Sequence, residues 1–256
     1  MLLMTRRLRS SASAFILAAA VACGGDSTGP TSSSSPTLDQ ALAELSIPAL
    51  AVGGLSLAGI DGPAPSLNPS NCSYSAAEQG FVCAPISSGG ITIGQSFTLY
   101  GASGLQSSFD PASTSSIHTS TLINGNSVGN GTALTVSGRQ ETTLAGLISG
   151  RHLLNGWSAI RIGGTITDET STYEVDVTVN TSFIDLVLPT SANGAVVWPS
   201  SGSMTGEISG TIGPVYLSQR TEITFTGTSS AYVGVTGAGG GTKSCKVDLA
   251  VAQAVC

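Results

Sequence analysis

The sequence predicts an all-β protein, an antiparallel β-sandwich or meander with one short N-terminal helix. Apolar and polar residues alternate through much of the chain beyond residue 72, only 9% of the 256 residues are charged, and 33 are glycine. Alternation with a period of two buries one face of a strand and leaves the other wet, as in antiparallel sheets. Low charge with abundant Thr, Val and Ile suits strands whose polar faces carry hydroxyl groups.

The chain begins with a cationic and apolar leader. Three arginines lie ahead of an apolar run at residues 12–20, and the small residues Ala20-Val21-Ala22 then lead into Cys23. The apolar run is too short to cross a bilayer core of about 30 Å, so residues 1–22 are predicted to be an export signal that is removed.

The end of this leader resembles a lipobox, the site at which bacterial lipoproteins are diacylated and cut. The resemblance implies acyl chains on Cys23, each methylene adding about 0.8 kcal/mol of membrane affinity, with more than one chain needed for stable anchoring. The next residue is Gly24 rather than the Asp that retains some lipoproteins at the inner membrane. We therefore expect a lipid-anchored protein of the cell envelope, outside the cytoplasm, with the outer membrane favoured. The alternative is an ordinary cleaved signal in which Cys23 is incidental.

Three further segments follow the leader. Residues 23–36 are small and polar, which is typical of a flexible tether. Residues 37–60 are predicted to form a short helix and an apolar segment that pack on the sheet, because Thr37 opens a capping box ahead of apolar residues at helical spacing, namely Leu38, Ala41, Leu42 and Leu45. Residues 61–256 are expected to form a single antiparallel β domain.

The charge of the mature chain excludes one class of partner. Removal of the leader leaves six basic against 15 acidic residues, a net charge near −9. Such a field repels phosphate backbones, so no nucleic-acid binding is expected. Docking on anionic lipid through a basic patch is excluded for the same reason.

The four remaining cysteines form two pairs with equal spacing. Cys72 and Cys83 are 11 residues apart, as are Cys245 and Cys256. An even number of cysteines in an oxidising compartment predicts disulfides, and the repeated spacing favours these two local pairs over the two other connectivities. The hairpins would be centred on residues 77–78 and 250–251. Zinc is the alternative, but this spacing without nearby histidines does not suit it, so no metal or cofactor is expected.

Period-two patterns predict individual strands, and interruptions of the pattern predict bends. Apolar alternation is clearest in four stretches, which are residues 91–99, 173–179, 223–225 and 247–251. Between Val179 and Ile184 the apolar positions change from odd to even, which predicts a turn or bulge at residues 180–182. Glycine-rich stretches predict loops or tight bends at residues 124–131, 162–164 and 237–241.

A candidate nucleophile does not lead to a catalytic site. Ser127 lies in a G-x-S-x-G pattern, but Asn-Gly and Gly-Asn steps flank it, so it is expected in a loop rather than on the strand-to-helix turn that a nucleophile elbow requires. His118 is expected in an exposed loop and His152 on a half-buried strand. Nothing in the sequence brings either histidine to Ser127.

The acidic candidates are also expected to be structural. Glu174 and Asp176 share a strand face about 7 Å apart, which is within glycosidase range, but only Trp157 and Trp198 could form aromatic platforms. Residues 168–169 are expected in a turn without the further oxygen ligands of a calcium site. No catalytic residue is predicted.

We therefore expect a non-enzymatic domain, displayed in the envelope, that binds or scaffolds an envelope protein or glycan. Two alternatives come from other classes. The first is a carrier of lipid or another hydrophobic ligand, with a curved antiparallel sheet around an apolar cavity. The second is an envelope hydrolase acting on a polysaccharide or an ester.

Overall fold

A computed structural model describes residues 71–129, 131–167, 171–189, 199–237, 240–248 and 253–255. The predicted leader, Cys23, the tether and residues 37–60 lie outside the described residues, as do residues 168–169, Trp198 and Cys256. Within the described ranges no helix is long and apolar enough to span a bilayer.

The described chain is nearly all antiparallel β-sheet, which confirms the predicted all-β class. Its strands are β1 (Cys72–Ser75), β2 (Gly80–Cys83), β3 (Ile86–Ser88), β4 (Ile91–Gly101), β5 (Gly104–Gln106), β6 (Thr114–Gly129), β7 (Thr132–Ala145), β8 (Arg151–Thr167), β9 (Thr172–Pro189), β10 (Ser201–Ile212), β11 (Val215–Phe225), β12 (Ser230–Gly237), β13 (Thr242–Asp248) and β14 (Gln253–Val255).

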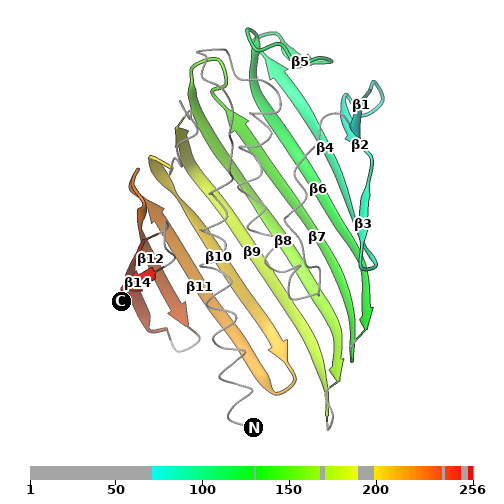
Figure 1. Cartoon of the computed structure of the whole chain (residues 1–256), viewed down its shortest axis with the longest axis vertical. Coiled ribbons are helices and arrows are strands. Elements are labelled where there is room, and N and C mark those ends of the chain that lie inside the picture. The colour runs from blue at the N-terminus through cyan, green and yellow to red at the C-terminus, as the bar shows by residue number, and fades with distance from the viewer. Residues whose placement is uncertain are drawn as a thin grey trace.

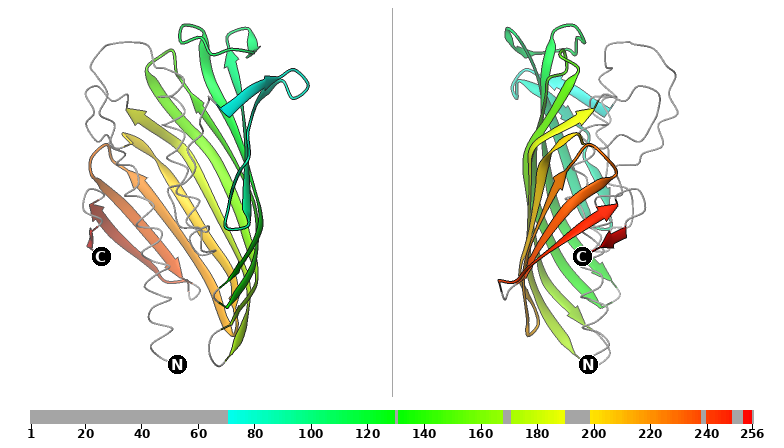
Figure 2. Two further views of the ribbon diagram at one scale, coloured as in Figure 1. Left: turned by 45° about the vertical axis from the view of Figure 1, so that its right-hand side comes forward. Right: turned by 90° about the vertical axis from the view of Figure 1, so that its left-hand side faces the viewer.

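These strands form one 14-stranded sheet in which chain neighbours are mostly spatial neighbours. The order is β1-β2-β4-β6-β7-β8-β9-β10-β11-β12-β13-β14, and the short strands β3 and β5 pair with β4. Figure 1 shows the long strands β6 to β11 lying side by side at a common tilt. In Figure 2 the sheet is strongly curved, and both of its edges bend toward the same side.

The two faces of the sheet differ in burial and chemistry. Along β8, Leu154, Ile160 and Ile162 are buried while Trp157 and Arg161 are exposed. We call the face with the buried side chains the inner face and the opposite one the outer face.

Two apolar clusters occupy the inner face. The first, which we call the upper cluster, is formed by Cys83, Phe97, Leu99, Ile117, Leu144, Leu147, Leu154, Phe183, Leu186, Leu188, Met204, Ile223, Phe225, Ala231 and Val233. The lower cluster is formed by Ile91, Ile93, Ile123, Leu134, Val136, Ile160, Ile162, Val175 and Val177. Together they supply the large buried residues of the described chain.

The predicted change of parity in β9 is confirmed, but its predicted position is wrong. Pairing of β8 with β9 passes from Leu154 opposite Leu186 to Gly156 opposite Phe183, so β9 has one extra residue there. The bulge therefore lies at residues 184–185 and not at 180–182, where pairing is regular. Asp185 has a φ of 49°, a left-handed conformation that Asp tolerates better than most residues.

Of the three glycine-rich stretches expected to be loops or tight bends, the first includes the turn between β6 and β7 only at its end, and the second is not a loop. Most of residues 124–131 belongs to β6, and residues 162–164 lie within β8. A side chain at Gly164 would place its Cβ 2.1 Å from the carbonyl oxygen of Ala133, so this glycine permits close approach of neighbouring strands. The third stretch is confirmed as a connection, because β12 ends at Gly237 and β13 begins at Thr242.

Candidate functional site

One row of paired residues crosses the inner face without an apolar side chain. Each member lies directly opposite the next on the neighbouring strand, from β4 through β6 to β11. We call these seven positions the polar row: Gln95, Thr121, Gln140, Ser158, Thr181, Gly206 and Thr221. The row separates the two apolar clusters, because on β4, β6, β7, β8 and β9 the upper cluster lies on one side of it and the lower cluster on the other.

Hydroxyl groups broaden the row on the side of the upper cluster. Thr119 and Thr142 are buried and face each other on β6 and β7, with their Oγ1 atoms 2.5 Å apart. At the other end of the row, Gln219 Nε2 donates to Thr221 Oγ1 at 3.5 Å. Polar side chains in and beside the row therefore form hydrogen bonds with their neighbours at both of these places.

Ser158 differs from these residues. It is only 2% exposed, and its Oγ has no hydrogen-bond partner among the described residues. A buried hydroxyl group without a partner costs about 1–3 kcal/mol of stability. Native structures contain few such groups, so each one requires an explanation.

Space is available beside the row at Gly206. A Cβ atom there would meet no heavy atom of the described residues within 4 Å. Elsewhere on the inner face, a Cβ at Gly156 would lie 2.3 Å from the carbonyl oxygen of Glu141, and one at Gly138 would lie 2.9 Å from that of Ala159. The inner face is thus tightly packed at these two glycines and open at Gly206.

The ion pairs found among the described residues lie on the outer face. Glu141 accepts hydrogen bonds from Arg139 and Ser120, and its Oε2 lies 2.8 Å from His118 Nε2. Trp157 is directly opposite Glu141 on β8 and is 45% exposed. His118 was expected in a loop, but it lies within β6, where this contact and Thr143 hold it.

Glu174 and Asp176 lie on the same outer face of β9, as predicted, and Asp176 is bonded to an arginine. Arg161 Nε and Nη2 donate to the two carboxylate oxygens of Asp176 at 3.0 and 3.1 Å. This hydrogen bonding holds the pKa of Asp176 below its usual value, against a smaller opposing effect of desolvation. Glu174 lies opposite Thr165, so the arrangement places an arginine rather than a second acid beside Asp176.

The structure separates Ser127 from both histidines. Ser127 lies within β6, not in the expected loop, and His118 is nine residues away along the same strand, about 30 Å at the usual rise. His152 is 1% exposed rather than half-buried. Ser127 pairs with Leu134 on β7, and Leu134 pairs with Gly164 on β8. Gly164 is 12 residues, or about 40 Å, from His152 along β8. A triad that uses Ser127 and either histidine cannot form in this arrangement.

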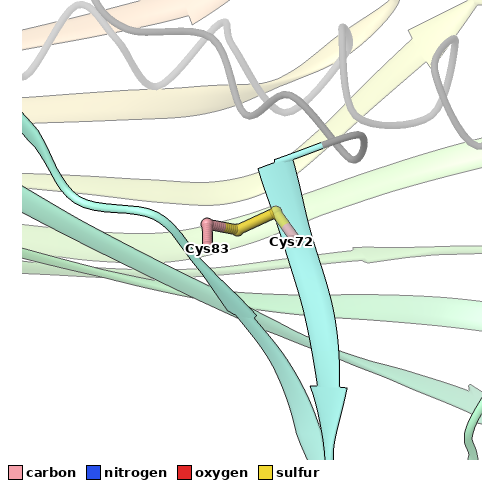
Figure 3. The surroundings of a disulfide bond; sticks show 2 residues. All are labelled: Cys72 and Cys83. Atoms are coloured by element: carbon pink, nitrogen blue, oxygen red, sulfur yellow. A yellow bond between two sulfur atoms is a disulfide. The ribbon is translucent and has the colours of Figure 1, made fainter.

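The first predicted disulfide is present. Cys72 lies directly opposite Cys83, and their Sγ atoms are bonded at 2.08 Å (Figure 3). Cys245 is also in a disulfide, and the pairing of Asp248 with Gln253 centres its hairpin on residues 250–251, as expected. Its predicted partner Cys256 lies outside the described residues.

Metal-binding clusters are not found in the part of the chain that the structure describes, where no three His, Cys, Asp or Glu side chains gather. The polar row was missed in the sequence analysis. Its only signal there was the presence of Gln95 and Gln140 at positions where the alternation calls for an apolar residue.

Comparison with known proteins adds no relative. No protein-family model, no curated protein and no solved structure matches the chain.

Proposed function

We propose that the protein is a lipid-anchored, non-enzymatic binding protein of the bacterial cell envelope, which holds the apolar chains of a lipid against the inner face of its sheet. Acyl groups on Cys23 would tie it to the membrane, with the outer membrane favoured, and residues 23–36 would act as the tether. The observation that carries this proposal is the pair of apolar clusters on one face of a single curved sheet.

The difference between the two faces favours an apolar ligand on one of them. Removal of apolar surface from water contributes about 25 cal/mol per Å². Buried apolar side chains line the inner face along most of the length of its long strands, whereas the outer face carries hydroxyl groups and ion pairs. An envelope protein or glycan partner would therefore meet the outer face, near Trp157.

We further propose that residues 37–60 cover part of the inner face. Leu99, Ile117 and Leu144 are 0% exposed, although the described strands form one sheet with its strands in chain order, which favours a meander over a sandwich. Residues 37–60 supply apolar side chains of the required kind and precede β1 by only 11 residues. A bound lipid would share the face with this segment or replace part of it.

A lipid analysis of the native protein tests the proposed function. The full chain would be expressed with its leader, purified in mild detergent under non-reducing conditions, and extracted with organic solvent for mass spectrometry. We expect non-covalent lipid in stoichiometric amount. A Cys23→Ser variant should lose covalent acyl groups and membrane anchoring while it retains this lipid, which distinguishes the anchor from the ligand. Protein that carries no lipid and takes none up from vesicles would refute the proposal.

A further inference from the structure

We propose that the polar row binds the neutral ester or hydroxyl group of a lipid whose apolar chains lie over the upper and lower clusters. This inference rests on the proposed function and specifies the class of ligand. It predicts a lipid with its polar linkage between apolar parts, such as a diacylglycerol.

The first argument is the unsatisfied hydroxyl group of Ser158. Its Oγ is buried without a partner among the described residues, and it lies at the centre of the row between Gln140 on β7 and Thr181 on β9. The amide and hydroxyl groups of these neighbours can both donate and accept hydrogen bonds. A carbonyl oxygen placed on the row would give the Ser158 hydroxyl group the acceptor that it lacks.

The second argument is space. Gly206 belongs to the row and lies directly opposite Thr181 and Thr221, and a Cβ there would contact no described residue within 4 Å. The row is therefore open toward the described residues two strands from Ser158. No other row position is a glycine.

The third argument is charge. None of the seven side chains in the row is ionisable. In the part of the chain that the structure describes, ion pairs hold Arg139, Arg161 and Arg220 to carboxylates on the outer face. A phosphate or carboxylate headgroup on the row would be taken out of water without a cation, which is costly. The row is suited to a neutral ester, amide or alcohol.

The fourth argument is the position of the row between the clusters. On β8, Leu154 and Ile162 each lie four residues from Ser158, which is about 13 Å in opposite directions. A lipid with its linkage at Ser158 can extend one apolar chain toward the upper cluster and another toward the lower cluster. A single-chain amphiphile with a terminal headgroup would use only one of them.

The test compares a neutral lipid ester with a hydrocarbon on the full-length protein after mild removal of bound lipid. Dioleoylglycerol and squalane would each be supplied from cyclodextrin, and the bound amount would be measured by gel filtration, extraction and gas chromatography. We expect dioleoylglycerol to bind more tightly than squalane. Equal affinity for the two, or tighter binding of the hydrocarbon, would overturn the inference while the proposed function stands.

Variants locate the polar contact. Ser158→Ala should weaken dioleoylglycerol binding about three- to tenfold, the value of one hydrogen bond, and leave squalane binding unchanged. Gly206→Leu should weaken binding of dioleoylglycerol by occupying the open space. The matched controls are Ser137→Ala and Gly94→Leu on the outer face, where a Cβ at Gly94 also meets nothing within 4 Å.

Each outcome is decisive. Unchanged dioleoylglycerol binding in Ser158→Ala and Gly206→Leu would place the ester elsewhere and overturn the inference. If Gly206→Leu fails to fold, as judged by circular dichroism, the isosteric Thr181→Val takes its place with the same expected loss. If neither compound binds the unaltered protein, the proposed function itself fails.

Discussion

Asn155 and Asp185 bind each other across β8 and β9 at the bulge where the parity of β9 changes. Asn155 Nδ2 donates to Asp185 Oδ1 at 3.2 Å, and the backbone N–H of Asp185 donates to Asn155 Oδ1 at 2.8 Å. One side chain thereby satisfies both the carboxylate and the backbone of a residue in the left-handed conformation. Leu186 and Leu188 depend on this bulge for their place on the inner face.

Asn155→Ala should lower the free energy of unfolding by about 1–2 kcal/mol, because both hydrogen bonds at the bulge are lost. Urea denaturation followed by circular dichroism measures the change. Asn180→Ala, on the exposed face of the regular part of β9, is the matched control and should change stability by less than about 0.5 kcal/mol. Equal effects of the two substitutions would show that the Asn155 contact does not hold the bulge.

Leu154→Ala should destabilise the protein by about 2–5 kcal/mol, the range for removal of a buried leucine side chain. Leu154 is 0% exposed in the upper cluster, whereas Leu122 on the outer face is 53% exposed. Leu122→Ala should therefore cost much less under the same denaturation conditions. Comparable losses for the two variants would mean that the assignment of inner and outer faces is wrong.

Arg161→Gln should raise the pKa of Asp176 toward its ordinary value, since hydrogen bonds from Arg161 are the main cause of the lowered pKa. A carboxyl group with a lowered pKa in the folded state contributes stability above its unfolded pKa, and this contribution is lost as the pH falls through the folded value. The contribution is small because the pair is exposed. NMR titration of the Asp176 carboxyl carbon measures the shift, and an unchanged titration would contradict the assignment.

Ser158→Ala should raise the free energy of unfolding of the lipid-free protein by about 1 kcal/mol, because it removes a buried hydroxyl group without a partner. Chemical denaturation of delipidated protein provides the measurement. Ser137→Ala, on the exposed outer face, should be neutral. A loss of stability in Ser158→Ala would mean that its hydroxyl group is already satisfied.

Replacement of both Cys72 and Cys83 by Ser should lower stability by roughly 2.5–3 kcal/mol on the chain-entropy account of a short loop. Non-reducing peptide mapping would establish which bridges are present, and denaturation would measure the loss. The same mapping tests the proposed Cys245–Cys256 pair. A Cys245–Cys83 peptide would contradict the register of both hairpins.

Local spacing predicted the local parts of the fold. The equal spacing of the cysteines placed both hairpins correctly, because two residues equidistant from a turn centre face each other across an antiparallel pair. The parity of β9 predicted a bulge but not its position. The position depends on Asp185 on β9, which tolerates positive φ, and on its partner Asn155, which lies on the neighbouring strand β8. The glycines of β6 and β8 were expected in loops or bends, whereas they lie within strands and allow neighbouring strands to approach closely.

The candidate site could not be predicted for a related reason. Gln95 and Gln140 are 45 residues apart in the sequence, and they join one row only after the registers of β4, β6 and β7 are fixed. A one-residue change in any of these registers would move a member of the row to the outer face. The row is a property of the whole sheet rather than of any segment.

The two edges of the sheet are formed by short strands, and each terminal hairpin contains a disulfide-bonded cysteine. β1 has four residues, β14 has three, and a disulfide cysteine lies in each terminal hairpin. A broad sheet with long unpaired borders would recruit strands from other molecules and grow into fibres, whereas a border of three or four residues offers little backbone for such growth. The short edge strands would thus hinder neighbouring copies of the protein from joining edge to edge.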